Sequence, residues 1–241
     1  AAALHADSAC CVCQGDVSPT GRLPVTFPTT DTPQTPDGAP HFSPAQWPGL
    51  IEGDASKPLP VPCTGFGIPF ASCEPGSIVE YSEGLLVGYR WYQQHDVAPA
   101  FCFGHGLGYS QFEYREHAMA ENGHLRNLLV TRLSTGTGAD DVSLRVRFTV
   151  TNTGSVPAAE IPQLYLGFPA EAGEPPKQLK GFRKTKVLDP RGSEMLTLDL
   201  TPRDVSIWDT ELGRFRVARG EFTAFVGASS CDIRLTGTAT L

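Results

Sequence analysis

Hydrophobic and polar residues alternate most regularly between residues 142 and 151. Every second residue from Val142 to Val150 is apolar, and Ser, Arg or Thr residues stand between them. A period of two predicts an antiparallel strand with one buried face and one face in water. The Asn-Thr-Gly sequence at 152–154 predicts the turn that follows this strand.

Short segments of the same kind recur to the end of the chain. Further strands are predicted at residues 161–166, 179–187, 196–200, 215–217, 222–226 and 233–235. About seven strands with turns roughly every 8–12 residues are typical of a sandwich of two antiparallel sheets. The pattern therefore predicts a mainly β fold, with an immunoglobulin- or fibronectin III-like β-sandwich at residues 115–241.

A short apolar alternation also occurs near the start of the chain. Within residues 1–28, Leu23, Val25 and Phe27 alternate with polar or proline positions, which predicts one short strand. The prolines beside these positions favour a strand that lies at the edge of a sheet or ends there.

The region between these two parts, residues 29–114, has little periodicity. It begins with a stretch rich in Pro and Gly, which predicts a long loop. It ends with two blocks, 81–92 and 101–114, in which aromatic residues surround glycines. Glycines let the backbone bend sharply while large rings stay anchored, so these blocks predict a joint between domains.

The composition is that of a globular protein and excludes several function classes. The chain has 241 residues, 40% of them hydrophobic, and a formal net charge of −7. Its 19 Lys and Arg residues form no basic run, so we expect no nucleic-acid partner. No run of about 18 apolar residues occurs, so we expect no membrane span. Because the chain opens with Ala1 instead of Met, we expect that residue 1 is not a natural start and that any targeting signal lies upstream.

The cysteines form no recognisable metal-binding pattern. Seven are present, at positions 10, 11, 13, 63, 73, 102 and 231. The cluster at 10–13 has only His5 nearby and no second Cys-x-x-Cys, so we expect no metal ligands. Cys63 and Cys73 flank a loop rich in Gly and Pro. They could pair if the protein is secreted, or stay free.

Several short blocks, taken in order, carry a resemblance to a known family. They are residues 15–28, 83–92, 103–109, 152–154, 163–166, 178–182, Trp208 and residues 226–230. Together they resemble the C-terminal part of a glycoside hydrolase family 3 enzyme of the β-glucosidase type. One departure is Cys102, which stands where the family's crossing into its last domain usually has Pro.

The resemblance implies the domain organisation. Residues 1–28 would be the C-terminal remnant of an α/β sandwich domain. Residues 29–114 would form the loop and the interdomain joint. Residues 115–241 would be a fibronectin type III-like domain.

The resemblance also implies retaining hydrolysis of β-linked glucosides by the whole enzyme. That reaction uses a nucleophile and an acid/base carboxylate about 5–5.5 Å apart. In the family both residues lie upstream of the position that matches Ala1. We therefore expect no catalytic, cofactor-binding or metal-binding residue and no cofactor in this chain. The chain would be an inactive structural or stabilising segment of a hydrolase.

Three acidic residues near the joint could in principle supply chemistry. Among Glu80, Glu83 and Asp96, the strongest candidate is Glu83, because it stands next to Gly84 in an aromatic block. The alternative, which we favour, is that Glu83 binds backbone groups or pairs with Arg90.

Other polar residues are more simply explained as structural. Asp204 and Asp209 flank Trp208, which predicts a capped turn beneath a buried indole. His105, between two glycines, predicts a structural histidine satisfied by the backbone. Ser229 and Ser230 predict a turn, since no Gly-x-Ser-x-Gly elbow surrounds them.

Three rings of the first block have two alternative roles. Tyr89, Trp91 and Tyr92 could stack on a sugar, since aromatic faces suit the C–H surfaces of a pyranose. We favour the alternative that they anchor the sandwich to the preceding domain.

Partners and location follow only from the family. We expect a β-glucoside or oligosaccharide as substrate of the full-length parent and an extracellular or secretory location. The sandwich could also mediate a homodimer. The alternative function is a free-standing module that binds carbohydrate or protein.

Overall fold

A computed structural model describes residues 21–29, 84–116, 129–134 and 142–241. The chain divides into two compact units, one formed by residues 1–27 with 101–241 and the other by residues 28–100. In the described part of the second unit, the regular element is one short helix, α1 (Tyr89–Gln94). The first unit contains all the strands described below.

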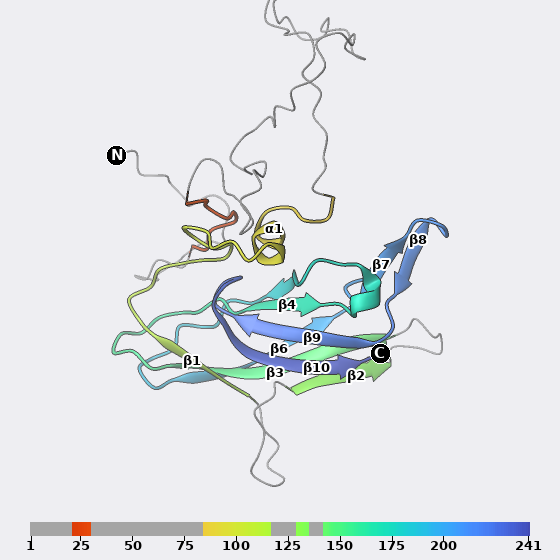
Figure 1. The fold of residues 1–241 in the computed structure, drawn as a ribbon. Coiled ribbons are helices and arrows are strands. Elements are labelled where there is room, and N and C mark those ends of the chain that lie inside the picture. The colour runs from red at the N-terminus through yellow and green to blue at the C-terminus, as the bar shows by residue number, and fades with distance from the viewer. Residues whose placement is uncertain (1–20, 30–83, 117–128, 135–141) are drawn as a thin grey trace, which may run out of the picture. The chain divides into compact units, whose positions relative to one another are not determined.

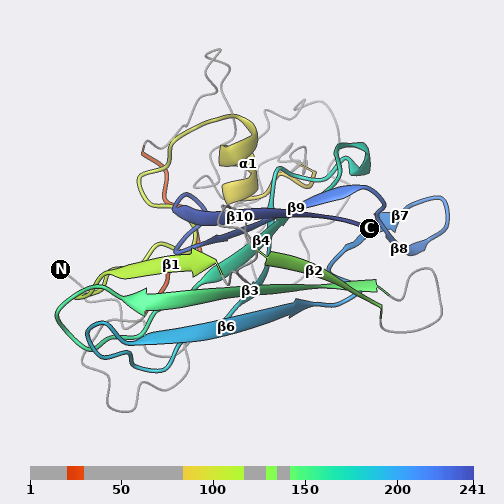
Figure 2. The ribbon, with the colours of Figure 1, turned by 90° about the horizontal axis from the view of Figure 1, so that it is seen from below.

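The first sheet is built around the long strand β3. Its members are β1 (Phe112–Glu116), β2 (Leu129–Ser134), β3 (Val142–Asn152) and β6 (Ser193–Leu200). β1 and β2 pair with successive halves of the same edge of β3, and β6 pairs with its other edge. All three pairings are antiparallel, and Figure 2 shows β3 between its neighbours.

The second sheet has the strand order β10-β9-β4-β5, and Figure 1 shows it stacked on the first. Its strands are β4 (Gln163–Gly167), β5 (Gln178–Phe182), β9 (Glu221–Gly227) and β10 (Ile233–Thr240). A short 3-10 helix, η2 (Ala170–Ala172), lies between β4 and β5. All neighbouring strands of this sheet are antiparallel.

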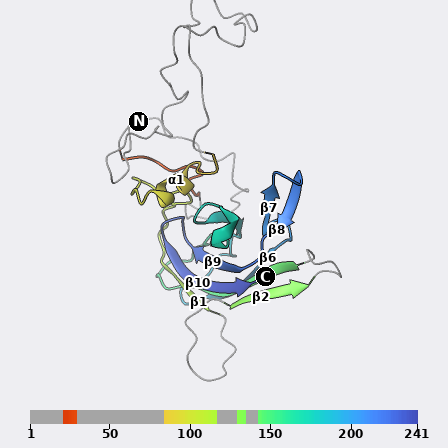
Figure 3. The same cartoon turned by 45° about the vertical axis from the view of Figure 1, so that its right-hand side comes forward.

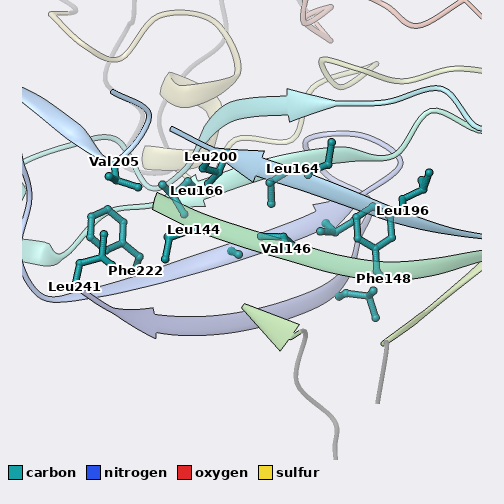
Figure 4. Packing of buried hydrophobic residues seen from close by; sticks show 14 of the residues in the cluster. Leu144, Val146, Phe148, Leu164, Leu166, Leu196, Leu200, Val205, Phe222 and Leu241 are labelled. Carbon is teal, nitrogen blue, oxygen red and sulfur yellow. The ribbon is translucent and has the colours of Figure 1, made fainter. Parts of the chain in front are cut away.

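The core lies between the two sheets and follows from the alternation in the sequence. Leu144, Val146 and Phe148 on β3 are fully buried, and they meet Leu164 and Leu166 from β4. Figure 4 shows these side chains in the space between the sheets. Burial of such side chains stabilises a fold by roughly 1.5–3 kcal/mol each. The predicted mainly β fold with a β-sandwich is confirmed.

A separate two-stranded ribbon, β7 (Ser206–Asp209) and β8 (Arg214–Val217), corrects one prediction. The sequence predicts Trp208 in the core, but 53% of its surface is exposed. The ribbon belongs to neither sheet, as Figure 3 shows. Side chains alternate along a strand, and Ile207 packs against the core, so Trp208 faces the other way.

The prediction of a short strand at residues 21–28 is also wrong, because this segment forms no regular strand. Its contact with residues 101–105 consists of an isolated bridge between Phe27 and Phe101 and of two hydrogen bonds at Leu23. Pro24 lacks a backbone N–H, which removes a donor from any ladder here. The paired segment therefore stays irregular between residues 23 and 27.

Candidate functional site

The segment that enters the sandwich, residues 101–111, is fixed to it at several points, and we call it the crossing segment. A disulfide joins Cys102 to Cys231, 129 residues further along the chain, in the connection between β9 and β10. The N–H of Ser230 donates to the carbonyl of Phe103 at 2.9 Å. A covalent bond and a hydrogen bond thus hold adjacent residues of the crossing segment on one loop.

A buried glutamine of β4 holds the next residue of the crossing segment. The side-chain amide of Gln163 donates to the carbonyl of Gly104 at 2.9 Å and to that of Ala228 at 2.8 Å. Its side-chain oxygen accepts a 2.5 Å hydrogen bond from the hydroxyl of Tyr165. Gly104 has a φ of +78°, in the left-handed region that favours glycine. These bonds connect the crossing segment to the centre of the second sheet.

Residues 22 and 23 attach to the same region. The N–H of Leu23 donates to the carbonyl of His105, and the N–H of Gly104 donates to the carbonyl of Leu23, each at 2.8 Å. The Arg22 guanidinium forms a salt bridge with Glu160 and donates to the carbonyl of Ala228. Burial lowers the pKa of Arg22. Glu160 is itself buried and accepts a hydrogen bond from the N–H of Ile161 at 2.6 Å.

These contacts surround a cavity of about 690 Å³. Its walls come from residue 22, the crossing segment, the start of β1, and the loops 158–161 and 228–234. The polar side chains that line it are Arg22, His105, Ser110, Gln111, Glu113, Tyr114, Thr153, Glu160, Ser229, Asp232 and Arg234. Most of them lie far apart in the sequence and meet only in the folded chain.

One wall of the cavity is a charge pair next to an aromatic ring. Arg234 donates two hydrogen bonds to Asp232, at 3.1 and 2.8 Å, and one to the carbonyl of Phe112 at 2.5 Å. The guanidinium carbon of Arg234 lies 4.8 Å from the centre of the Tyr114 ring. The hydrogen bond from Arg234 lowers the pKa of Asp232 below its usual range. Burial raises the pKa of Tyr114.

The carboxylates of this cavity do not match the acid of a glycosidase. The cavity's carboxylates belong to Glu113, Glu160 and Asp232, and each forms a salt bridge with an arginine. A glycosidase acid must hold its proton near neutral pH, which requires a raised pKa. The Asp232 carboxyl has the opposite pKa shift.

The predicted capped turn around residue 204 is confirmed. Asp204 accepts hydrogen bonds from the backbone N–H of Thr201 at 2.8 Å and from its hydroxyl at 2.7 Å. Asp209 accepts from the N–H groups of Glu211 and Leu212 and from Arg216. Both aspartates therefore shape turns, although the indole between them is exposed.

His105 and the serine pair lie beside the cavity. The backbone N–H of His105 donates to the carbonyl of Cys102, and its ring packs on Phe101, with centroids 5.5 Å apart. Its carbonyl accepts from the N–H of Leu23, so its backbone groups are paired. That backbone groups also satisfy its ring stays a prediction. The hydroxyl of Ser229 accepts from the N–H of Asp232 at 3.0 Å, which fits the predicted turn.

The rings of α1 are buried. Tyr89, Trp91 and Tyr92 each keep less than a tenth of their surface exposed. The Trp91 ring stacks on that of His95, with centroids 4.6 Å apart. Their faces are therefore not open to a sugar. Asp96 is exposed just after the helix.

Several predicted sites fall outside the described residues. These are Glu80, Glu83, Cys63, Cys73 and the cysteines at 10–13. Within the described residues there is no group of three or more His, Cys, Asp or Glu side chains that could hold a metal ion. Nor does any helix there have the length and apolar character needed to span a membrane.

Sequence reasoning missed the disulfide, the Arg22–Glu160 and Arg234–Asp232 salt bridges, and the place of Tyr114 in the cavity wall. The one signal in the sequence was Cys102, which replaces an expected proline. No local pattern links Cys102 to Cys231 or Arg22 to Glu160, because each pair is more than 100 residues apart.

Comparison with known proteins identifies the family. The family model of the fibronectin type III-like domain matches residues 160–230. "Probable beta-glucosidase L" of Aspergillus terreus is 34% identical over 237 residues, which cover 95% of this chain and 27% of that protein. "Probable beta-glucosidase D" of Aspergillus niger is 38% identical over 163 residues, or 67% of this chain and 22% of that protein. The solved GH3 β-glucosidase of Bifidobacterium adolescentis matches with a TM-score of 0.64 and 32% identity, over 93% of this chain and 26% of that one.

The chain belongs to glycoside hydrolase family 3. It corresponds to the C-terminal part of these family 3 enzymes, which carries their fibronectin type III-like domain, so the predicted resemblance is confirmed. It spans about a quarter of the length of the family 3 relatives it matches.

Proposed function

We propose that this chain is the non-catalytic C-terminal part of a retaining β-glucosidase, and that it stabilises the catalytic part. The parent would hydrolyse the O-glycosidic bonds of β-glucosides or oligosaccharides. This proposal is supported by β-glucosidase relatives that match almost the whole chain. It is also supported by a cavity whose carboxylates are all paired with arginines.

The observation that carries the structural role is the attachment of the crossing segment. It is joined to the sandwich by the Cys102–Cys231 disulfide, by Gln163 and by Ser230. A flexible tether between domains would not need a covalent bond and several buried hydrogen bonds. A segment fixed in this way can transmit the rigidity of the sandwich to the polypeptide that precedes it.

Truncation of the full-length parent tests this role. Ending the parent after Tyr109 should lower its melting temperature by several degrees, while kcat/KM of the enzyme that stays folded changes little. In parallel, the 241-residue chain alone should not hydrolyse an aryl β-glucoside. An unchanged melting temperature would overturn the stabilising role, and hydrolysis by the isolated chain would overturn the non-catalytic one.

We also propose an extracellular or secretory location. Disulfides form and persist mainly in oxidising compartments, and Cys102 is bonded to Cys231. Peptide mapping of the unreduced natural protein should recover these two cysteines in one linked peptide. Recovery of both as free, alkylated thiols would count against this location. A homodimer through the sandwich stays a prediction from the sequence, which light scattering can test.

A second function, carbohydrate binding by the sandwich itself, is favoured by one observation. The exposed Trp208 contacts Phe215 on the β7–β8 ribbon, with ring centroids 4.8 Å apart. Exposed aromatic pairs on a rigid ribbon suit the apolar faces of sugars. Retention of the chain on insoluble β-glucan that is lost in Trp208→Ala, but kept in Phe182→Ala, would support this function. Phe182 is a matched control because its ring is exposed on β5. No retention of the unaltered chain would exclude it.

A further inference from the structure

The stretch from β5 to the start of β6 carries positive charge that the proposed function does not use. The sequence has no uninterrupted basic run, but basic residues recur throughout residues 177–191, which we call the basic edge. They are Lys177, Lys180, Arg183, Lys184, Lys186 and Arg191. The carboxylates at the basic edge are Asp189, within it, and Glu174 and Glu194, which bond to it. Positive charge is therefore in excess here, although the net charge of the chain is −7.

Backbone hydrogen bonds fix the second half of the basic edge. The N–H of Arg183 donates to the carbonyl of Pro162 at 3.3 Å, and the N–H of Arg191 donates to that of Asn152 at 2.8 Å. Leu188, between them, is buried and forms an antiparallel bridge to the loop before β4. These bonds use main-chain atoms, so they hold the segment in place without occupying its charged side chains.

Three cations of this fixed segment face water. Thr185 and Leu188 are buried, whereas Arg183, Lys186 and Arg191 are exposed. None of these three forms a salt bridge with another residue in the described part of the chain. An anion can therefore bind them without breaking an existing ion pair, which would be costly.

The three cations are spread across the edge of the sandwich. Arg183 directly follows β5, an edge strand of the second sheet, while Arg191 is bonded to the last residue of β3 in the first sheet. Stacked sheets lie about 10 Å apart, so a small anion would reach the cations at one end only. Single exposed ion contacts are weak, and a ligand with repeated charges along an extended chain can make several of them together.

We propose that the basic edge binds an acidic polysaccharide, a chain of sugars that bear carboxylates. A guanidinium can donate two parallel hydrogen bonds to a carboxylate, and a lysine adds a compact positive charge. The choice of a polysaccharide over a nucleic acid rests on the extracellular or secretory location proposed above. It does not rest on the parent's activity or on the β7–β8 ribbon.

Calorimetric titration of the intact 241-residue chain with polygalacturonate tests this proposal. Binding should weaken as NaCl is added, because salt screens exposed charges. The triple variant Arg183→Gln, Lys186→Gln, Arg191→Gln should raise the Kd roughly 3- to 100-fold, as expected for three exposed ion contacts. Its melting temperature should stay close to that of the unaltered chain, since the main-chain bonds of the segment remain.

The matched control is the triple variant Arg132→Gln, Arg214→Gln, Arg219→Gln. It makes the same change in net charge at three exposed arginines outside the basic edge, so it should keep most of the affinity. The proposal is overturned if polygalacturonate does not bind, if both triple variants lose affinity equally, or if single-stranded DNA binds more tightly than polygalacturonate.

A neutral β-glucan separates this site from the β7–β8 ribbon. Any retention on that glucan should be unchanged in the variant of Arg183, Lys186 and Arg191, because a neutral polymer offers no partner for their charges. Equal loss of β-glucan and polygalacturonate binding in that variant would contradict a site built on charge. An unchanged melting temperature of the truncated parent would overturn the stabilising role and leave this inference intact.

Discussion

Gly104 shows how one residue fixes the crossing segment. Its φ is +78°, and a Cβ at this position would overlap the Gln163 side-chain oxygen. Gly104→Ala should therefore destabilise the chain by about 2–5 kcal/mol. The left-handed conformation costs roughly 1–2 kcal/mol for other residues. A displaced Gln163 would add about 1–3 kcal/mol, because it leaves buried carbonyls without their donor. Urea denaturation measures the difference.

Gly173 provides the control for that substitution. It also has a positive φ, +66°, but a Cβ added there would meet no atom within 4 Å. Gly173→Ala should lower the free energy of unfolding only by the cost of the left-handed backbone conformation, roughly 1–2 kcal/mol. If both substitutions cost the same, the contact with Gln163 would contribute nothing.

At the scale of elements, the disulfide should stabilise the crossing segment and the β9–β10 connection together. It closes a loop of 129 residues between Cys102 and Cys231. Constraining the unfolded chain over a loop of this length contributes about 4–5 kcal/mol in the chain-entropy model, although measured values extend down to about zero. Reductant should therefore lower the melting temperature of the unaltered chain.

The double variant Cys102→Ser, Cys231→Ser separates this bond from the other cysteines. It should melt at about the temperature of the reduced chain and should not respond to reductant. A variant that melts with the oxidised chain would show that the bond adds no stability. A response to reductant in the variant would point to a second disulfide.

The elements differ in how well the sequence predicts them. β3 is evident from the sequence because apolar and polar residues alternate from Val142 to Val150, and burial follows this alternation from Leu144 onward. β1 is missed, since it begins at Phe112 inside a block whose glycines and aromatics predict an interdomain joint. Trp208 is misplaced because hydrophobicity alone does not tell a core strand from a ribbon outside both sheets.

The cavity lies beyond sequence-based prediction for a different reason. Its salt bridge between Arg22 and Glu160 joins residues 138 apart, and its Tyr114 lies on the missed strand. Such a site depends on the packing of distant loops, which leaves no periodic trace in the sequence. Cys102, next to the cavity, is unusual because it replaces an expected proline. The sequence does not show that it bonds to Cys231.

For the whole molecule, we expect aspartates in three separate places to contribute to the response to acid. Hydrogen bonds from arginine lower the pKa of Asp199 and Asp232, and backbone hydrogen bonds, with Arg216, lower that of Asp209. A carboxyl whose pKa is lower in the folded state than in the unfolded state stabilises the fold at pH values above its unfolded-state pKa of about 3.9. This contribution is lost as the pH falls through the folded-state pKa. Each contribution is small, because at least one partner of each pair is about half exposed and solvent screens the interaction. Glu116 acts in the opposite direction, since burial raises its pKa.

The free energy of unfolding should therefore fall between about pH 5 and pH 2, and the three aspartates should account for much of that fall. The triple variant Asp199→Asn, Asp209→Asn, Asp232→Asn removes the titrating groups and keeps their shape. It should be less stable than the unaltered chain at pH 7, and the two should converge as the pH approaches 2, because protonation has by then removed the same charges from the unaltered chain. Urea denaturation at several pH values measures both curves. Parallel curves would show that other carboxylates control the acid response.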